Sequence, residues 1–582
     1  MSSPYPSLQT MDLPSPFIWD VKPNPAFQAA LETRFKPLQT TYPGMIRFGK
    51  SNKYSSFLRF DHKWHLEEFV SDVPQKSGPF LGRARLFKDG QPQTGPDSLI
   101  DISGFCKITH LLDAYRMMQG KYPMSQHPAL PAPGKKSAKV YSKVHDPHNQ
   151  AYVDAVASYM LSKFREGDHS PHFSLFYGSY LAIANKYYYN ITEDFQDMRF
   201  ESWFWRKREQ GLFKLIGYQG DSLLPEDDPL MEAPDDLSST DSSSESSISE
   251  LDVSNIDAES VGSGSLESAS ISTASQAQDE SESESGSGSE SGSDSDYESE
   301  ESLDKDITLF AALSDFPTML IFLEANKDTM DSLLEDDCPH MTAVIGSPEW
   351  EAQWSAWVFQ VIAALCQIQS LWAMTHNDLH SNNILWTPTD KEFLYYKTRD
   401  GRFWKVPTYG KLFRIIDFGR AIYTHNGTLC ISDDYWPEND AGTQYNFGPL
   451  YDPSQPRVYP NPSFDLCRLA VSIVEGLFLE IPPDVKGTTV VLSRETDRVQ
   501  HETVSPLFNV MWSWMIDDDG RNVLWDADQS ERYPGFDLYR VIAQKVKHAV
   551  PREQLDKEPF VGFAMSLEDD VPGGEKVYSL FC

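Results

Sequence analysis

Apolar residues recur at steps of three and four between Trp354 and Ile368, and this spacing predicts a helix with a buried face. Ser347 is placed to cap its first turn, Pro348 suits the first helical position, and Glu349 favours the positive end of the helix dipole. The segment is apolar enough to raise the question of a membrane span. Four glutamines interrupt it too often for a span, so we expect a core helix and no membrane segment: Gln353, Gln360, Gln367 and Gln369.

Two short apolar runs, Ile384–Trp386 and Leu412–Ile416, have the length of strands. Between them, aromatic-rich runs at 393–397 and 402–406 flank Asp400-Gly401, a dipeptide that favours a tight hairpin turn. We expect these runs to lengthen the hairpin made by the first two strands and to pack their aromatic rings inside. Apolar residues at helical steps predict two later helices, from Leu466 to Leu477 and from Phe536 to Val546.

A polar motif, His376–Asn383, follows the predicted helix, and Ile415–Gly419 follows it in turn, with Asp417 34 residues after Asn383. In phosphoryl transfer the protein mainly places a hydroxyl, metal ions and a triphosphate in line. That task requires an Asp base, an Asn and a second Asp. The pattern therefore predicts that Asp378 takes the acceptor proton, that Asn383 and Asp417 bind Mg²⁺, and that His376 braces the loop.

The two motifs resemble those of the eukaryotic-type protein kinase superfamily, whose catalytic loop is H-R-D-x-x-x-x-N and whose metal-binding strand ends in D-F-G. The wording here, H-N-D-L-H-S-N-N-I and I-I-D-F-G-R-A, is most similar to divergent kinase-like proteins of giant viruses and some microbial eukaryotes. The resemblance implies an α+β, two-lobed fold, with an antiparallel β small lobe and a mainly helical large lobe. It implies ATP and Mg²⁺ as cofactors and transfer of the γ-phosphate to a protein hydroxyl, Ser or Thr.

The resemblance also assigns parts of the small lobe. Lys139–Val144 would be the strand with the phosphate-binding lysine; Lys143 is the favoured residue and Lys139 the alternative. The next helix, from Asn149 to Arg165, carries Asp154, a shorter substitute for the usual Glu partner. Segments 176–178 and 316–324 would be the fourth and fifth strands, and backbone groups from Glu324 to Asn326 would hold adenine. In the large lobe, Asp465 matches the family residue that supports the catalytic loop from below.

Some residues depart from the family pattern. Asn377 replaces the Arg that grips an activating phosphate in many kinases, so we do not expect activation of that kind. His380 replaces the Lys of Ser/Thr kinases, and H-x-D-x-H-x-x-N is also the usual loop of kinases that act on small molecules. No Gly-rich loop precedes Lys139. The nearest candidate for a loop that binds phosphates is segment 131–136, and its composition is equally typical of a solvated basic turn. A small-molecule kinase and a pseudokinase that acts as an interaction scaffold therefore remain alternatives.

Charge is concentrated in one segment, because residues 221–306 hold 26 of the 86 acidic residues and a single Lys. The segment is rich in Ser and Gly and poor in aromatics, so we expect it to be disordered. It would dock a basic partner, be phosphorylated, or serve only as a spacer. The rest of the chain is mildly acidic and shows no basic surface for nucleic acid.

These features predict a domain order: an extension without an assigned role at 1–104, the first part of the small lobe at 105–218, the insert at 219–306, the last small-lobe strand and hinge at 307–326, and the large lobe at 327–582. The six cysteines have neither C-x-x-C pairing nor regular spacing, which indicates a reduced, intracellular environment, cytoplasmic or nuclear. No secretion signal or lipid anchor is visible.

Overall fold

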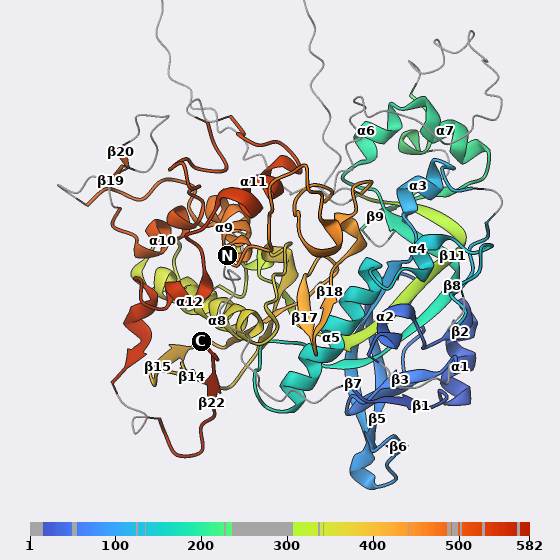
Figure 1. The fold of residues 1–582 in the computed structure, drawn as a ribbon, viewed down its shortest axis with the longest axis horizontal. Coiled ribbons are helices and arrows are strands. Elements are labelled where there is room, and N and C mark those ends of the chain that lie inside the picture. Colours follow the sequence, from blue (N-terminus) through green and yellow to red (C-terminus); the bar gives the residue numbers. More distant parts are fainter. Residues whose placement is uncertain are drawn as a thin grey trace, which may run out of the picture. The chain divides into compact units, whose positions relative to one another are not determined.

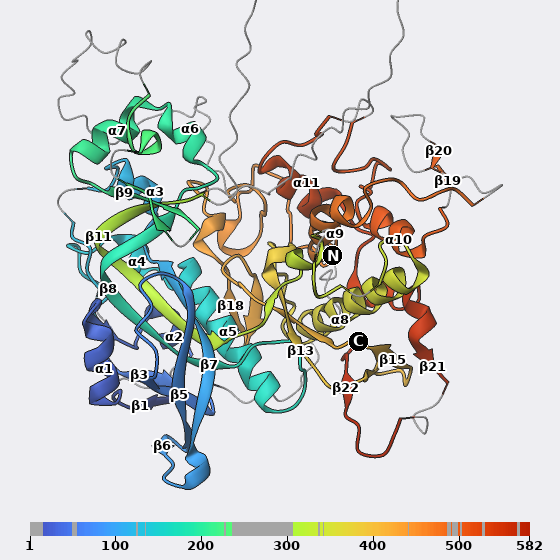
Figure 2. The same cartoon turned by 180° about the vertical axis from the view of Figure 1, so that it is seen from behind.

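The computed structural model describes residues 16–48, 55–123, 126–133, 136–220, 222–225, 228–234, 307–335, 338–341, 343–439, 441–485, 490–491, 499–500, 503–526, 530–566 and 571–582. The chain divides into two compact units, one of Met1–Tyr187 with Ser314–Cys582 and one of Tyr188–Leu313. Both helices and largely antiparallel sheets are present, as the predicted α+β class requires (Figures 1 and 2). Much of the acidic insert, residues 235–306, lies outside the described residues, so its predicted disorder stays a prediction.

In the first unit the described helices are α1 (Pro25–Glu32), α2 (Pro43–Ile46), α3 (Ala114–Met118), α4 (Ser142–His145), α5 (Gln150–Glu166), α8 (Pro348–Trp372), α9 (Phe464–Leu477), α10 (Pro506–Trp514), α11 (Asp537–Lys545) and α12 (Pro551–Gln554). Its first strands are β1 (Ile18–Asp20), β2 (Phe35–Gln39), β3 (Leu58–Phe60), β4 (Trp64–Phe69), β5 (Gly78–Lys88), β6 (Gln91–Pro92) and β7 (Leu99–His110). Later strands are β12 (Asp328–Thr329), β13 (Ile384–Pro388), β14 (Phe393–Lys397), β15 (Phe403–Pro407), β16 (Lys411–Ile415), β17 (Tyr423–His425), β18 (Thr428–Cys430), β19 (Val490–Val491), β20 (Val499–Gln500), β21 (Ala564–Met565) and β22 (Val577–Ser579).

Two long strands, β8 (Phe176–Asn190) and β11 (Ile307–Glu324), contribute residues to both units. The second unit also contains α6 (Phe195–Arg199), α7 (Ser202–Glu209), β9 (Lys214–Gln219) and β10 (Ser222–Leu223). There β9 pairs antiparallel with the first part of β11, from Ile307 opposite Gln219 to Ala312 opposite Lys214. Regular structure thus continues past residue 219, where the insert was predicted to begin.

The main sheet of the first unit places β11, β7, β5 and β4 side by side, and β8 pairs with β11. β7 pairs antiparallel with β5 on one side and with β11 on the other. The predicted boundary between residues 104 and 105 is wrong, because it falls inside β7 and would separate β4 and β5 from their own sheet. The alternation of Ile100, Ile102, Cys106 and Ile108 with polar residues is the strand pattern that marks β7 in the sequence.

The predicted core helix is confirmed as α8, which begins at Pro348 with the Ser347 hydroxyl accepting a hydrogen bond from the Trp350 N–H at 3.2 Å. It packs against β15, β16, α10 and α12 (Figure 1). Gln360 is fully buried and bonds both ways with the backbone of β16, donating to Lys411 O and accepting from Phe413 N, each at 3.0 Å. α8 is long and apolar enough to cross a membrane by length and composition, yet 89% of its most apolar window is buried inside the protein.

The predicted hairpin also forms, with β14 pairing antiparallel with β15 around the Asp400-Gly401 turn. We predicted that this hairpin would lengthen the β13–β16 pair, and that prediction is wrong. β14 and β15 instead belong to a separate sheet of order β21-β15-β14-β22, in which the C-terminal strand β22 runs parallel to β14. Tyr396 and Trp404 are buried in this sheet, as expected for packing residues.

Candidate active site

The loop from His376 to Asn383 connects α8 to β13, and α9 holds it from one side. The Asp465 carboxylate, in the first turn of α9, accepts hydrogen bonds from the backbone N–H groups of His376 at 3.0 Å and Asn377 at 2.9 Å. Asp465 is fully buried, and burial raises the pKa of its carboxyl. Two backbone donors compensate for that burial. The predicted support of the loop by Asp465 is therefore confirmed.

His376 joins this loop to the strand end that carries Asp417. Its Nδ1 accepts from the Asp378 backbone N–H at 3.3 Å, so the ring proton lies on Nε2 and is donated to Ile416 O at 2.8 Å. The ring is fully buried beside Phe418, with the two ring centres 5.3 Å apart. His376 thus braces the loop against the segment Ile416–Phe418, as the sequence predicted.

Asn377 is buried, and its side chain takes part in neutral hydrogen bonds only. Its side-chain amide donates to the backbone oxygens of Thr375 and Arg420, and its Oδ1 accepts from the Tyr445 hydroxyl at 2.5 Å. Its φ of +64° lies in the left-handed region, where Asn is among the few non-glycine residues that are found readily. An uncharged amide committed to three neighbours offers no grip for a phosphate.

Asp378 is the carboxylate in this loop, and its side chain is 19% exposed. Its Oδ1 accepts a hydrogen bond from the Tyr539 hydroxyl at 2.9 Å and lies 3.9 Å from Arg420 Nη1. Burial acts to raise the pKa of Asp378, but Arg420 and other nearby cationic groups outweigh burial and hold the pKa below its ordinary value. Asp378 is therefore ionised at neutral pH.

Asn383 and His380 form the end of the loop. Asn383 Nδ2 donates to Asp378 O at 2.8 Å and lies 3.0 Å from His380 Nε2. Because the Asn383 amide nitrogen can only donate, His380 Nε2 accepts, and burial lowers the pKa of His380. His380 is thus a neutral imidazole that orients Asn383 and brings no fixed positive charge.

Asn383 and Asp417 stand at adjacent strand ends. Ile384 pairs with Ile415 across the β13–β16 ladder, and the Ile416 N–H donates to Asn383 O at 3.0 Å, so Asp417 lies one residue beyond. Asp417 has a φ of +63°, a strained conformation of the kind that occurs at functional sites. Its side chain is 41% exposed. The predicted pair of metal-binding residues is thus brought together by the strand register.

The lysine beside Asp417 is Lys107 on β7, a residue that no motif in the sequence marks. Its Nζ lies 2.7 Å from Asp154 Oδ2 on α5 and 2.7 Å from Asp417 Oδ1. Burial would lower the pKa of Lys107, but the two carboxylates raise it, and Lys107 in turn lowers the pKa of Asp417 to about 2. Asp154 also accepts from the Phe418 N–H at 3.0 Å, so one carboxylate links Lys107 to the D-F-G segment.

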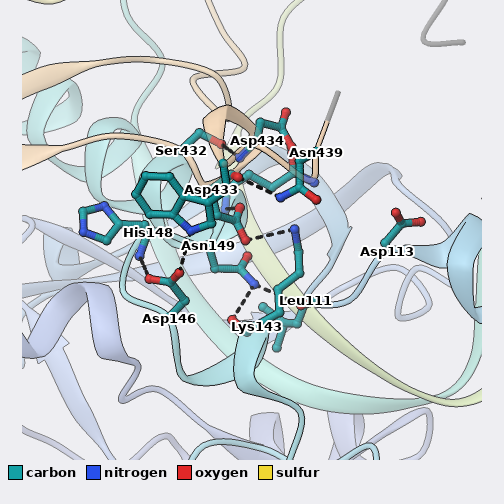
Figure 3. Close-up of polar contacts among 12 residues, drawn as sticks. Leu111, Asp113, Lys143, Asp146, His148, Asn149, Ser432, Asp433, Asp434 and Asn439 are labelled. Atoms are coloured by element: carbon teal, nitrogen blue, oxygen red, sulfur yellow. Dashed lines mark hydrogen bonds and ion pairs between the residues drawn. The ribbon is translucent and has the colours of Figure 1, made fainter. Parts of the chain in front are cut away.

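Lys143, the predicted nucleotide lysine, occupies a different place. Segment 139–144 is no strand, because Lys139 lies in a turn and Lys143 in the short helix α4. Figure 3 shows the Lys143 ammonium directed at the Asp433 carboxylate, 2.9 Å away. Asp433 also accepts from the Gln150 N–H at the start of α5, at 2.9 Å. Lys143 therefore anchors the segment after β18 to α4 and α5, and the predicted pair of Lys143 with Asp154 is wrong.

The side chains of Glu324 and Asn326 are also committed elsewhere. Glu324 forms ion pairs with Arg165 and Arg414, and Asn326 accepts from Arg414 at 2.8 Å. The backbone N–H of Glu324 donates to Leu175 O and that of Ala325 to Ser103 O. Among the described residues no hydrogen bond from the Asn326 N–H is found, so this donor remains for a ligand.

Exposed apolar side chains lie on the face of the sheet that carries Lys107. Residues 103, 105 and 107 share one face of β7, and Ser103 pairs with Leu81 of β5. Phe105 is 39% exposed and Leu81 is 54% exposed, whereas the residues of the opposite face, such as Cys106 and Ile108, are buried. The connection before β5, residues 70–77, ends at Gly78 in this same sheet.

The candidate phosphate-binding loop at 131–136 is only partly described, since Gly134 and Lys135 lie outside the described residues.

The predicted magnesium ligands fit that ion by the chemistry of their oxygens. In the described part of the chain, no group of three or more His, Cys, Asp or Glu side chains is arranged to hold a metal. One amide oxygen and one carboxylate suit a cation that takes its other ligands from water and phosphate oxygens, which is how Mg²⁺ binds beside a nucleotide.

Comparison of the chain with models of protein families finds no match, and comparison with curated proteins finds none either. The geometry of the site is therefore the basis for any statement about function.

Proposed function

We propose that this protein is an ATP- and Mg²⁺-dependent protein kinase that transfers the γ-phosphate to a Ser or Thr hydroxyl. One observation carries the proposal: Lys107 lies 2.7 Å from both Asp154 and Asp417, while Asp417 and Asn383 lie at neighbouring strand ends beside Asp378. A lysine on a small-lobe strand, paired with an acid on the next helix and placed beside the D-F-G aspartate, is the arrangement on which protein kinases depend.

The order of elements supports a two-lobed kinase fold. Lys107 lies on the third strand of the antiparallel series β4, β5 and β7, and α5 with Asp154 follows. β8 comes next, and β11 follows after the elements of the second unit; the chain then passes to the helical part that begins with α8. The chain thus follows the kinase order of lysine strand, helix, two further strands and connection.

Each residue has a role in this proposal. Lys107 would steady the α- and β-phosphates, and Phe105 and Leu81 would contact the adenine ring, with the Asn326 N–H as its hydrogen-bond donor. Asn383 and Asp417 would hold Mg²⁺, which supplies neutralisation of the phosphate charge. Asp378, ionised and partly exposed, would orient the acceptor hydroxyl and take its proton.

A small-molecule acceptor remains the second candidate, because His380 is neutral and bonded to Asn383. A neutral imidazole gives the transferred phosphate no fixed charge, in contrast to the Lys of Ser/Thr kinases. The acceptor class is therefore decided by experiment.

The test is to incubate the full chain with Mg²⁺ and γ-labelled ATP, together with mixed protein substrates and, separately, a set of small alcohols. Three variants are compared with wild type: Asp378→Asn, Lys107→Met and, as a matched control, Lys391→Met at an exposed ion pair. Label on protein that disappears in the first two variants and persists in the third supports a protein kinase. Label on small alcohols alone supports the second candidate, and nucleotide binding without transfer supports a scaffold. Absence of both binding and transfer contradicts the proposal.

A further inference from the structure

Tyr539 contacts the proposed base from a helix far away in the sequence. It lies on α11, 161 residues after Asp378, and its hydroxyl is 2.9 Å from Asp378 Oδ1. Asn383 and Asp417 belong to motifs near Asp378 in the sequence, whereas Tyr539 belongs to neither. The contact therefore exists only because α11 packs beside the loop.

The direction of the hydrogen bond follows from a third residue. Arg468 Nε lies 3.0 Å from the Tyr539 hydroxyl oxygen, and a guanidinium can only donate. The Tyr539 oxygen accepts from Arg468, so its own proton points to Asp378. Burial and the nearby Asp378 carboxylate raise the pKa of Tyr539, so the hydroxyl keeps this proton at neutral pH.

The tyrosine ring is held firmly. It is 5% exposed, stacks on Phe536 with ring centres 4.8 Å apart, and touches Phe464 of α9 with ring centres 5.9 Å apart. The guanidinium groups of Arg468 and Arg420 also lie over the ring, 5.3 Å and 5.7 Å from its centre. A ring enclosed in this way cannot swing its hydroxyl away from Asp378.

Helix α9 thus acts on the loop through two residues one turn apart. Asp465 binds the backbone of the loop at His376 and Asn377, and Arg468 sets the hydroxyl that binds the Asp378 side chain. Arg468 is itself buried, 3% exposed, so its hydrogen bond to Tyr539 is shielded from water.

We infer that Tyr539 is a positioning residue for Asp378: its hydroxyl, directed by Arg468, holds Oδ1 and leaves Oδ2 to receive the proton of the acceptor. The inference rests on the proposed phosphotransferase function. It adds a relay of Arg468, Tyr539 and Asp378, in which the hydrogen bond to the Asp378 side chain comes from α11.

The test compares Tyr539→Phe with Tyr423→Phe. Tyr423 is the matched control, because it is also buried and donates its hydroxyl to a backbone oxygen, Val153 O at 2.9 Å, away from Asp378. We expect Tyr539→Phe to lower kcat by about 10- to 100-fold, the effect of one hydrogen bond to a charged group, with KM for ATP changed less than about twofold. The acid limb of the kcat/KM profile should move to higher pH, because the carboxylate loses a donor that favours its charged form.

An unchanged kcat and acid limb in Tyr539→Phe would overturn the inference, as would equal changes in Tyr423→Phe. A second variant, Arg468→Met, guards against a folding defect in the first. It should lower kcat in the same direction, and the double variant should lose less than the sum of the two single losses, because both act on one hydrogen bond while Arg468 also acts on Asp378 through its charge. Additive losses would contradict the relay.

A separate measurement distinguishes failure of this inference from failure of the proposed function. The Asp378 carboxyl carbon is followed by NMR during a pH titration of the wild type and of Tyr539→Phe. If the wild type transfers no phosphate, the proposed function fails, yet an upward shift of the Asp378 pKa in the variant would still support the contact. If the wild type is active and the two titrations coincide, the inference fails and the proposed function stands.

Discussion

The Lys143 ammonium lies 2.9 Å from the Asp433 carboxylate, so the lysine that the family resemblance marked for a nucleotide instead joins α4 to the segment after β18 (Figure 3). Lys107, 36 residues earlier, occupies the place beside Asp417. Replacing Lys107 should therefore mainly affect activity, whereas replacing Lys143 should mainly affect stability.

We predict that Lys107→Met abolishes most phosphate transfer while Lys143→Met mainly lowers stability. Removing Lys107 takes the positive charge away from the proposed phosphate position. Removing Lys143 leaves Asp433, which is 2% exposed, without its cation, a loss of about 3 kcal/mol in the free energy of unfolding at pH 8. Urea unfolding and label transfer measure the two effects. Equal activity losses in both variants, at equal stability, would show that the lysines were assigned wrongly.

The stability change in Lys143→Met should depend on pH. Burial raises the pKa of Asp433 to about 6, although Lys143 acts to lower it. A raised folded-state pKa means that the folded protein holds this proton more tightly than the unfolded chain, so Asp433 lowers stability as pH rises from about 4 to about 6. At pH 5 the carboxyl is largely protonated, and losing Lys143 costs less than at pH 8. Unfolding curves at both pH values test this, and Asp433→Asn should remove the difference.

Asp465→Asn should weaken the support of the loop. An amide has one acceptor oxygen, whereas the carboxylate accepts from the backbone of both His376 and Asn377. We expect a loss of about 1–3 kcal/mol in stability and a lower kcat, because one buried donor is left without a partner. Asp537→Asn, a 61% exposed carboxylate on α11, is the control and should leave both quantities unchanged.

Phe105→Ala should weaken nucleotide binding with little effect on stability. The ring is 39% exposed in the ligand-free protein, so its removal leaves no cavity in the core. We expect the Kd for ATP to rise about tenfold, the effect of losing roughly 1.5 kcal/mol of apolar contact. Phe200→Ala, at a ring that is 57% exposed and belongs to the second unit, is the control in a calorimetric titration. An unaltered Kd for Phe105→Ala would remove this ring from the adenine site.

Activity should survive treatment with a phosphatase. Asn377 offers no positive charge, and Arg420, which follows the D-F-G segment, already pairs with the Asp434 carboxylate at 3.2 Å. We therefore propose that this built-in carboxylate serves the purpose of an activating phosphate. Asp434→Asn should lower kcat, and phosphatase-treated wild type should match untreated protein. Loss of activity after that treatment would argue for control by phosphorylation.

Local pattern was sufficient for much of this structure. The spacing of apolar residues predicted α8, α9 and α11, and the Asp-Gly turn predicted the β14–β15 pair. These elements depend on residues a few positions apart, so their signals survive in the sequence. The helix α5 was placed by the family resemblance instead. The sheet in which β14 and β15 lie was not predictable in this way, because β22 and β21 come from the C-terminal end of the chain.

Asp378, Asn383 and Asp417 were likewise visible in two short motifs, because the phosphoryl transfer proposed for them requires fixed residue types at fixed positions. The partner of Asp417 was decided by packing: the register of β7 between β5 and β11 and the position of α5 bring Lys107 to Asp154, 47 residues away. Tyr539 meets Asp378 for the same reason, since α11 rests on α9. Charged groups and hydroxyls that belong to no local pattern acquire their partners only when distant elements pack together. Packing, and not the sequence motifs, therefore decides that Lys107 and Tyr539 lie at the candidate site.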